Sequence, residues 1–241
     1  MNTAKPLTEL RVKIFADGSA KDEMLALSKV PYIKGFTTNP TLMHKAGVKD
    51  YAAFAKEIIA AIPDKPISFE VFSDDFMEME REARIIGAWG KNVYVKIPIM
   101  NTRGQSSAPL VKKLSDGGFK LNVTMILTPA QVRVATEALN AGVSSIISVF
   151  AGRAADVGVD PMPIMRESKK MMSAKPSIEL LWASTRELYN IYEAEEVGAE
   201  IITVPPSILK KIAGIGKGLD AVTLEGVQTF YDDGRTAGYK I

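Results

Sequence analysis

The chain has 241 residues, of which 46% are apolar and 24% charged, a composition typical of a globular protein. Its 30 basic and 28 acidic residues are interspersed and give a net charge of +2, so nothing indicates nucleic-acid binding. The absence of cysteine excludes disulfides, thiolate metal sites and a cysteine nucleophile. No apolar run approaches the roughly 20 residues needed to span a bilayer, and residues 1–10 do not resemble a signal peptide. The single histidine, His44, is expected in a surface loop, with no second histidine for a metal site.

Short β-rich runs alternate with helical stretches along the chain. Strands are predicted at residues 11–17, 33–38, 67–73, 93–99, 120–127, 144–150, 177–184 and 200–205. Helices are predicted at residues 51–61, 75–90, 108–116, 129–141, 163–172, 186–197 and 207–213. Asp50 and Asp75 are suitable N-caps, and Pro129 and Pro163 suit first-turn positions. Eight strands with intervening helices predict an α/β fold, a closed (β/α)8 TIM barrel.

The last part of the chain, residues 214–241, falls outside the eight strand and helix units. It contains a predicted helix at residues 219–231, on which Val222, Val227 and Phe230 are apolar. This C-terminal helical appendage is expected either to pack on the barrel or to reach a neighbouring subunit. No linker rich in proline, glycine or serine divides the chain, so we expect residues 1–241 to form one barrel domain.

Every predicted strand has a polar residue near its carboxyl end, where barrel enzymes place their chemistry. These residues are Asp17, Asn39, Glu70, Lys96, Asn122 with Thr124, Ser148, Ser184 and Thr203. Because side chains alternate along a strand, Lys96 lies on the face opposite Val95 and Ile97. We therefore expect the apolar faces to contact the outer helices and the polar side chains to converge in the barrel mouth.

Lys96 is the most informative of these residues because it interrupts an apolar strand. Burial of a lysine favours the neutral amine, which can add to a carbonyl carbon and form a Schiff base. Taken alone, this motif more often marks a lysine that extends to water. The other strand ends reverse that reading, because Asp17 and Glu70 can transfer protons and Thr124 can hold a water molecule beside Glu70.

The same mouth is expected to bind a polar, anionic substrate. Asn39 and Asn122 can both donate and accept hydrogen bonds, which suits sugar hydroxyls. Arg153 and Arg186 follow the sixth and seventh predicted strands, and Ser184 lies beside Arg186. Two arginines on adjacent loops with a serine hydroxyl suit a phosphate or another oxyanion.

Seven short motifs carry a family resemblance. They are GFTTNPTL at residues 35–42, FEV at 69–71, VKIP at 95–98, NVT at 122–124, SVFAGR at 148–153, ASTR at 183–186 and TVPP at 203–206. In order and spacing they resemble the transaldolase family of class I aldolases, which are (β/α)8 barrels, and the length of the chain resembles that of the shorter, fructose-6-phosphate-aldolase-like members.

The resemblance implies a role for each matching residue. Lys96 resembles the Schiff-base lysine, Asp17 the acid/base for carbon–carbon cleavage, and Glu70 with Thr124 the pair that holds the catalytic water. The residues that resemble substrate ligands are Asn39, Asn122, Ser148 and Phe150 for the donor sugar and Arg153, Ser184 and Arg186 for its phosphate.

The resemblance also implies transfer of a dihydroxyacetone unit in the pentose phosphate pathway. The donor would be sedoheptulose 7-phosphate or fructose 6-phosphate, and the acceptor glyceraldehyde 3-phosphate or erythrose 4-phosphate. No metal or organic cofactor, no nucleic acid and no membrane are implied. A cytoplasmic homo-oligomer, a pentamer or decamer, is expected.

Some positions depart from the family pattern and leave the exact sugars open: Gly18, residues 126–128, Val149 and Ala151. One alternative is a lyase similar to fructose-6-phosphate aldolase, which releases free dihydroxyacetone; those relatives tend to carry glutamine at the position of Glu70 and tyrosine near Thr124. A transaldolase specialised for another anionic sugar, such as a sulfo-sugar, is a second alternative. A non-catalytic barrel is a third, which the set of Lys96, Asp17, Glu70 and Thr124 disfavours.

Overall fold

The computed structural model describes residues 5–18 and 20–240 of the chain. Within them, parallel strands β1 to β8 form a closed barrel, each pairing with the next and β8 with β1. Their bounds are β1 Lys13–Asp17, β2 Ile33–Thr37, β3 Ile67–Glu70, β4 Val93–Pro98, β5 Leu121–Ile126, β6 Ser145–Val149, β7 Ile178–Trp182 and β8 Ile201–Val204. The predicted TIM barrel is thereby confirmed, whereas the predicted domain range also includes residues 1–4, 19 and 241, which lie outside the described residues.

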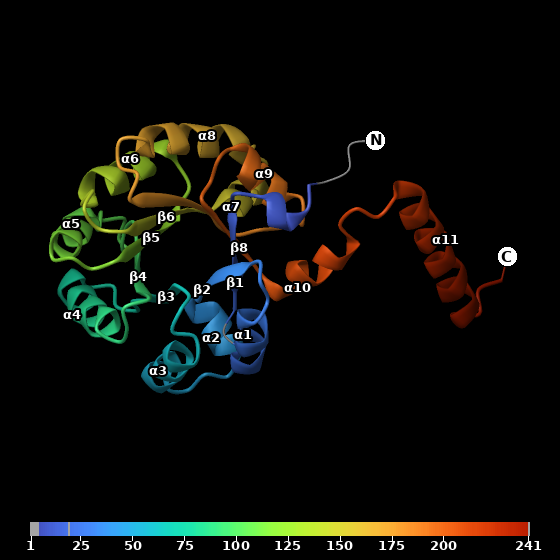
Figure 1. Cartoon of the computed structure of the whole chain (residues 1–241), viewed down its shortest axis with the longest axis horizontal. Coiled ribbons are helices and arrows are strands. Elements are labelled where there is room, and N and C mark those ends of the chain that lie inside the picture. The colour runs from blue at the N-terminus through green and yellow to red at the C-terminus, as the bar shows by residue number, and fades with distance from the viewer. Residues whose placement is uncertain (1–4, 19, 241) are drawn as a thin grey trace.

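Helices surround the barrel (Figure 1). The α-helices are α1 Lys21–Ser28, α2 Pro40–Lys45, α3 Tyr51–Ala61, α4 Phe76–Gly87, α5 Ala108–Asp116, α6 Pro129–Ala138, α7 Ala151–Asp156, α8 Pro161–Met172, α9 Asn190–Glu196, α10 Pro206–Leu209 and α11 Leu219–Thr236, and the 3-10 helices are η1 Leu7–Glu9 and η2 Lys210–Gly214. Sequence patterning missed α1, α2 and α7, whose eight or fewer residues give a weak periodic signal. The structure also corrects the start of α8 from Pro163 to Pro161, because Asp160 caps it by accepting from Met162 N. His44, expected in a loop, lies in the last turn of α2.

The two faces of the barrel strands pack in two different apolar layers, one outside the barrel and one inside it. On β4, Val95 and Ile97 are buried in the core between barrel and helices, as the alternation predicts. The inward face has a smaller apolar cluster, made of Phe15, Tyr94, Ile146, Leu181, Ala183 and Ile201. In β1 and β4 the inward residue two positions further along is polar, Asp17 after Phe15 and Lys96 after Tyr94. Polar side chains therefore lie above an apolar plug at the carboxyl end of the barrel.

Several strands end earlier than predicted, and two of them show why. β3 ends at Glu70 because the backbone N–H groups of Phe72 and Ser73 donate to the Glu82 carboxylate at 2.9 and 3.0 Å. β7 ends at Trp182, and Ser184 then adopts a φ of 67°, which is left-handed backbone. At both positions the backbone therefore leaves the sheet close to the barrel mouth.

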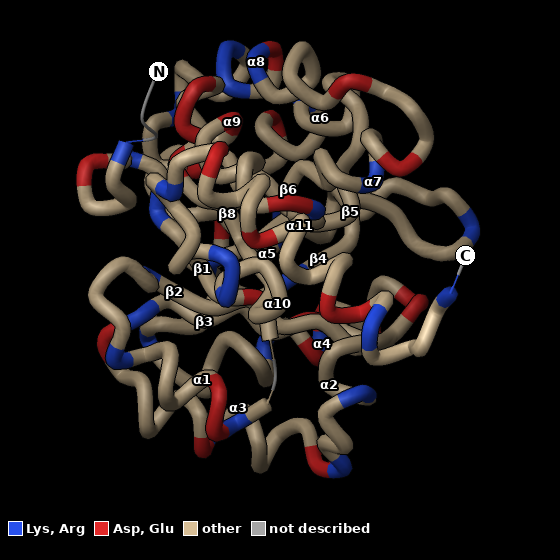
Figure 2. The backbone as a smooth tube through the Cα atoms, turned by 90° about the vertical axis from the view of Figure 1, so that its right-hand side faces the viewer, with Lys and Arg blue, Asp and Glu red and all other residues tan. Residues whose placement is uncertain are grey.

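The C-terminal helix α11 extends away from the barrel (Figure 1). None of its residues is buried, and its apolar side chains include Val222, Val227 and Phe230, which are 47%, 60% and 78% exposed. Acidic and basic residues are interspersed over the surface (Figure 2). Among the described residues no helix is long and apolar enough to cross a membrane.

Candidate active site

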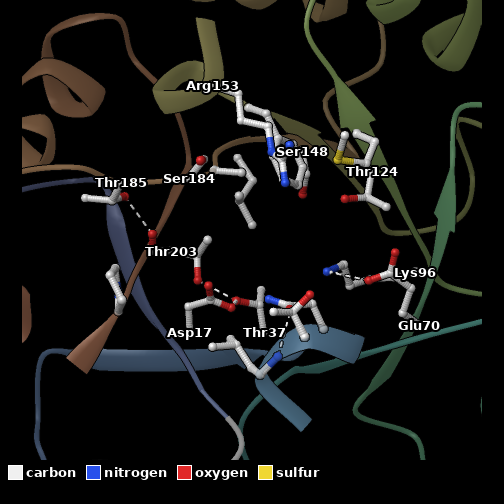
Figure 3. Close-up of a pocket in the computed structure, with 18 of the residues that line it drawn as sticks. Asp17, Thr37, Glu70, Lys96, Thr124, Ser148, Arg153, Ser184, Thr185 and Thr203 are labelled. Carbon is white, nitrogen blue, oxygen red and sulfur yellow. Dashed lines mark hydrogen bonds and ion pairs between the residues drawn. The ribbon is translucent and has the colours of Figure 1, made fainter. Parts of the chain in front are cut away.

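The inward polar residues surround a cavity of about 410 Å³ at the carboxyl end of the barrel. Every residue that the sequence placed in the site lines this cavity except Asn122. Figure 3 shows Lys96 and Glu70 at the right, Asp17 and Thr37 below, and Arg153, Ser148 and Ser184 above. The cavity therefore presents an amine and carboxylates at one end and basic and hydroxyl groups at the other.

Lys96 is held by two oxygen atoms. Its Nζ donates to the Thr38 backbone carbonyl at 2.8 Å and lies 3.1 Å from Glu70 Oε2. Glu70 and Lys96 are paired positions on β3 and β4, which brings their side chains together on the inner face. Only 7% of the Lys96 side chain is exposed, so a buried amine faces the cavity with a carboxylate beside it. Such a group can act as a nucleophile once the carboxylate or water accepts its proton.

Asp17 approaches the cavity from β1. One of its oxygens accepts from Thr37 Oγ1 at 2.8 Å, and that hydroxyl also contacts Thr203 Oγ1. Burial raises the pKa of the Asp17 carboxyl above its ordinary value, as does Glu70, while Lys96 and the Thr37 hydrogen bond act in the opposite direction. A carboxyl with a raised pKa holds a proton more readily than an ordinary aspartate, which suits a group that must both take up and return a proton.

Asn122 is the exception to the predicted site. It is fully buried, its Nδ2 donates to Ser68 Oγ at 3.1 Å, and its Oδ1 accepts from Ser148 Oγ at 2.6 Å. The side chain therefore lies behind Ser148 and outside the cavity lining, and its contact orients the Ser148 hydroxyl. That Asn122 contacts sugar hydroxyls stays a prediction, and in this structure it reaches the cavity only through Ser148.

Thr124 and Asn39 both line the cavity. Within the part of the chain that the structure describes, the buried Thr124 Oγ1 has no hydrogen-bond partner. Asn39 is the N-cap of α2, where its Oδ1 accepts from Leu42 N at 3.0 Å. The cap fixes the Asn39 side chain through its oxygen, and the amide nitrogen remains as a donor for a ligand in the cavity.

The basic end of the cavity is built from the segments after β6 and β7. Arg153 lies over the Phe150 ring at 5.8 Å in a cation–π contact. Arg186 forms a bidentate pair with Asp156, with Nε 2.8 Å from Oδ1 and Nη2 bonded to Oδ2. This pair holds one edge of the guanidinium and leaves Nη1 free of it. Asp156 was not anticipated, since only the fold brings α7 beside the β7 loop.

A close backbone approach fixes the shape of this end. A Cβ atom on Gly152 would lie 1.7 Å from the carbonyl oxygen of Ser184. Glycine is therefore required at position 152 while Ser184 keeps its left-handed conformation. Such strained backbone is concentrated at functional sites, because the surrounding contacts must hold it.

Thr37 and Thr203 also line the cavity; the sequence placed Thr203 at the barrel mouth without giving it a role and did not indicate Thr37. Thr37 and Thr203 face inward on β2 and β8, and the first bridges Asp17 to the second. Their inward positions could be derived from strand alternation, but their mutual contact depends on barrel closure. Among residues 5–18 and 20–240, no cluster of histidine, aspartate and glutamate could hold a metal ion.

Comparisons with solved structures show the same fold. Solved structures of the same fold include 2,3-dimethylmalate lyase, a PEP mutase/isocitrate lyase superfamily member, with a TM-score of 0.58 and 16% identity over 95% of this chain and 86% of that one. Another is a putative fructose-1,6-biphosphate aldolase from Coccidioides immitis, with a TM-score of 0.59 and 10% identity over 85% of this chain and 79% of that one. At such identities the likeness shows the fold alone.

Sequence relatives are more specific. A "Probable transaldolase" of Thermoanaerobacter sp. is 35% identical over 95% of this chain and 100% of its own length. A "Probable transaldolase 2" of Listeria monocytogenes is 34% identical over 92% of this chain and 95% of its own length. The family model described as Transaldolase/Fructose-6-phosphate aldolase matches residues 14–239. The chain therefore belongs to the transaldolase/fructose-6-phosphate aldolase family.

Proposed function

We propose that the protein is a transaldolase in which Lys96 forms a Schiff base with a ketose phosphate and transfers a dihydroxyacetone unit to an aldose phosphate. The observation that carries the proposal is the buried Lys96 amine, whose Nζ lies 3.1 Å from a Glu70 oxygen in a cavity that Asp17 also lines. A binding site alone has no need of a buried amine, because burying one is costly.

The proposed reaction begins at Lys96. Its neutral amine adds to the ketose carbonyl carbon, and loss of water gives an iminium ion. Glu70, the carboxylate nearest Nζ, takes the proton that the lysine loses. Glu70 and Thr124 together orient the water that leaves and later returns, since the buried Thr124 Oγ1 has no hydrogen-bond partner among the described residues and would gain one in that water.

Asp17 performs the proton transfer of the carbon–carbon step. It takes the proton of the hydroxyl on the carbon that leaves as the aldehyde; as that carbon forms its C=O bond, the two electrons of its carbon–carbon bond move to the iminium and give an enamine on Lys96. The first aldose leaves, the acceptor aldehyde enters, and the enamine attacks its carbonyl carbon while Asp17 returns the proton. Hydrolysis of the new iminium releases the product and restores the amine. The raised pKa of Asp17 suits both directions of this transfer.

The phosphate of each sugar is proposed to bind at the basic end. Arg153, Ser184 and the free Nη1 of Arg186 supply the donors, as planar guanidinium groups suit phosphate oxygens. Sedoheptulose 7-phosphate and fructose 6-phosphate are the proposed donors, with glyceraldehyde 3-phosphate or erythrose 4-phosphate as acceptor, within the pentose phosphate pathway of the cytoplasm. If the substrate were a sulfo-sugar instead, a sulfonate would take the place of the phosphate at this end of the cavity.

The family also includes fructose-6-phosphate aldolases, so release of free dihydroxyacetone is the competing reaction. A carboxylate at Glu70 and a hydroxyl at Thr124 favour transfer, because neither is a phenol that would protonate the enamine directly. The test is cleavage of fructose 6-phosphate with and without an aldose phosphate. A transaldolase turns over quickly only with the acceptor present, whereas equal rates of ketose consumption in both assays would contradict transfer.

A further inference from the structure

The hydrogen-bond ladder between β2 and β3 stops abruptly beside Lys96. Phe36 N donates to Pro66 O and Thr38 N to Ser68 O, at 2.9 and 3.2 Å, which are regular rungs of a parallel pair. In such a pair the next rung would join Glu70 N to the Thr38 carbonyl. That rung is absent from the described structure, because Glu70 N donates instead to the hydroxyl of Tyr51 at 2.8 Å.

The Tyr51 hydroxyl forms hydrogen bonds with both backbone groups of Glu70. It accepts from Glu70 N and donates to Glu70 O at 3.0 Å. Burial raises the pKa of this phenol, so the hydroxyl keeps the proton that it donates. Tyr51 is the first residue of α3, where Asp50 caps the helix by accepting from Ala53 N. The hydroxyl thus reaches the end of β3 from an anchored position.

The ring of Tyr51 is fixed by aromatic neighbours. Its centroid lies 6.0 Å from that of Phe69, 4.5 Å from Phe72 and 5.7 Å from Trp89, all in edge-on arrangements. Such pairs add to the stabilisation from buried area and restrict ring orientation. Tyr51 is not part of the cavity lining, so its hydroxyl acts on the site only through Glu70 and its neighbours.

The displaced carbonyl has a different partner. Thr38 O, which would accept from Glu70 N in a continued ladder, accepts from Lys96 Nζ at 2.8 Å. We infer that Tyr51 is a positioning residue for Lys96: by occupying the backbone of Glu70 it frees the Thr38 carbonyl to hold the amine and fixes the Glu70 carboxylate beside it. This inference rests on the proposed Schiff-base function of Lys96.

Removal of the hydroxyl has a defined consequence. In Tyr51→Phe, Glu70 N loses its acceptor, and the acceptor that a continued ladder offers is the Thr38 carbonyl, which would close the missing rung. That exchange withdraws the carbonyl from Lys96 and shifts Glu70 toward β2. An unpaired buried polar group is costly, so the loss of one such contact is expected to slow Schiff-base formation by about tenfold or more.

The experiment is the single-turnover rate of borohydride-trapped adduct with fructose 6-phosphate, measured in wild type, Tyr51→Phe and two control variants. Tyr94→Phe removes another hydroxyl, which contacts Ser144 Oγ at 2.7 Å on the far side of the inner apolar cluster. Trp89→Phe alters the packing around the Tyr51 ring without touching its hydroxyl. We expect only Tyr51→Phe to slow adduct formation, with KM for the ketose phosphate almost unchanged because the phosphate contacts lie across the cavity.

Three results would overturn the inference. The first is a Tyr51→Phe rate equal to that of wild type, and the second is an equal loss in Trp89→Phe, which would make the effect one of packing. The third needs no variant: a crystal structure of the wild-type protein with Glu70 N bonded to Thr38 O. A wild-type protein that forms no adduct with any ketose phosphate would instead refute the proposed function, and the inference would fall with it.

Discussion

Lys96 and Glu70 are paired residues on neighbouring strands, and their side chains meet at the inner face of the barrel with Nζ 3.1 Å from Oε2. The pair is buried, with 7% and 15% of the two side chains exposed. Removing one partner of a buried pair leaves an uncompensated charge, so each residue depends on the other. The relationship determines how the proposed nucleophile is held and how it loses its proton.

Glu70 and Thr124 are expected to decide between transfer and release. In the proposed mechanism the enamine on Lys96 must persist until an acceptor arrives, and a water held by these two residues would control how readily it is protonated. Glu70→Gln, alone or with Thr124→Tyr, should therefore raise the release of free dihydroxyacetone relative to transfer. The measurement is the ratio of the two products with a ketose phosphate donor and a fixed amount of aldose phosphate. An unchanged ratio in both variants would show that these positions do not set the reaction type.

Arg153 and Arg186 are expected to bind the substrate phosphate. Removal of one partner of a charge-assisted hydrogen bond costs about 1.5–3 kcal/mol, which corresponds to roughly tenfold or more in kcat/KM. Arg153→Ala and Arg186→Ala should each show this loss with phosphorylated ketoses and a much smaller one with unphosphorylated ketoses. Arg166→Ala is a suitable control, because Arg166 pairs with Glu196 on the surface. Equal losses on both substrate types would contradict the assignment.

Asp17 should make both activity and stability depend on pH. Because burial raises its pKa, the carboxylate that acts as base for cleavage forms only as the pH rises through that raised value, so cleavage should increase over the same range. The free energy of unfolding should change in the opposite direction. The folded protein holds the proton more tightly than the unfolded chain, so the stability present below the ordinary value of 3.8 is lost as the pH rises through the raised pKa.

Asp17→Asn provides the matched test of this pH dependence. The variant keeps the shape of the side chain and its contact with Thr37 but cannot ionise. We expect it to lose cleavage activity and to melt at a higher temperature than wild type at neutral pH, with the difference shrinking under acidic conditions. A melting-temperature difference that stays constant across the pH range would be inconsistent with a raised Asp17 pKa.

The apolar side chains of α11 are expected to contact a second copy of the chain. Val222, Val227 and Phe230 are exposed, although an 18-residue helix carrying such residues normally buries them. We therefore propose a homo-oligomer that buries α11. Light scattering should give a multimer for the full chain and a smaller species after truncation at residue 217 or for a Val227→Asp/Phe230→Asp variant. A full-length monomer at micromolar concentration would disprove the proposal.

Much of the fold could be predicted because periodicity in a barrel strand is strict. The alternation around Lys96 placed it inward, opposite Val95 and Ile97, and the structure confirms that these two lie in the outer core. The ends of the strands were less accurate, because they depend on contacts from elsewhere in the sequence. Glu82 lies ten residues beyond Phe72 and binds its backbone N–H just after the end of β3, and no local pattern indicates that.

The candidate site was predictable only as a set of side chains that face one end of the barrel. Asn122 shows the limit, because its inward direction was correct but its depth placed it behind Ser148. Depth depends on the stagger between strands, which is a property of the closed barrel. Contacts made by backbone atoms could not be predicted either. Lys96 Nζ donates to the Thr38 carbonyl, and the sequence does not indicate in which direction a backbone carbonyl points.

The most direct test of the account is identification of the lysine that becomes covalently attached to substrate. Wild-type protein is incubated with fructose 6-phosphate or sedoheptulose 7-phosphate, reduced with borohydride, and digested for peptide mass mapping. The account predicts a single modified lysine, Lys96, and no adduct in Lys96→Ala or Lys96→Arg, since a guanidinium is not deprotonated in proteins and cannot act as the amine. Both variants should retain the circular dichroism spectrum of the wild type. An adduct on another lysine, such as Lys13 or Lys120, or one that persists in Lys96→Ala, would contradict the account.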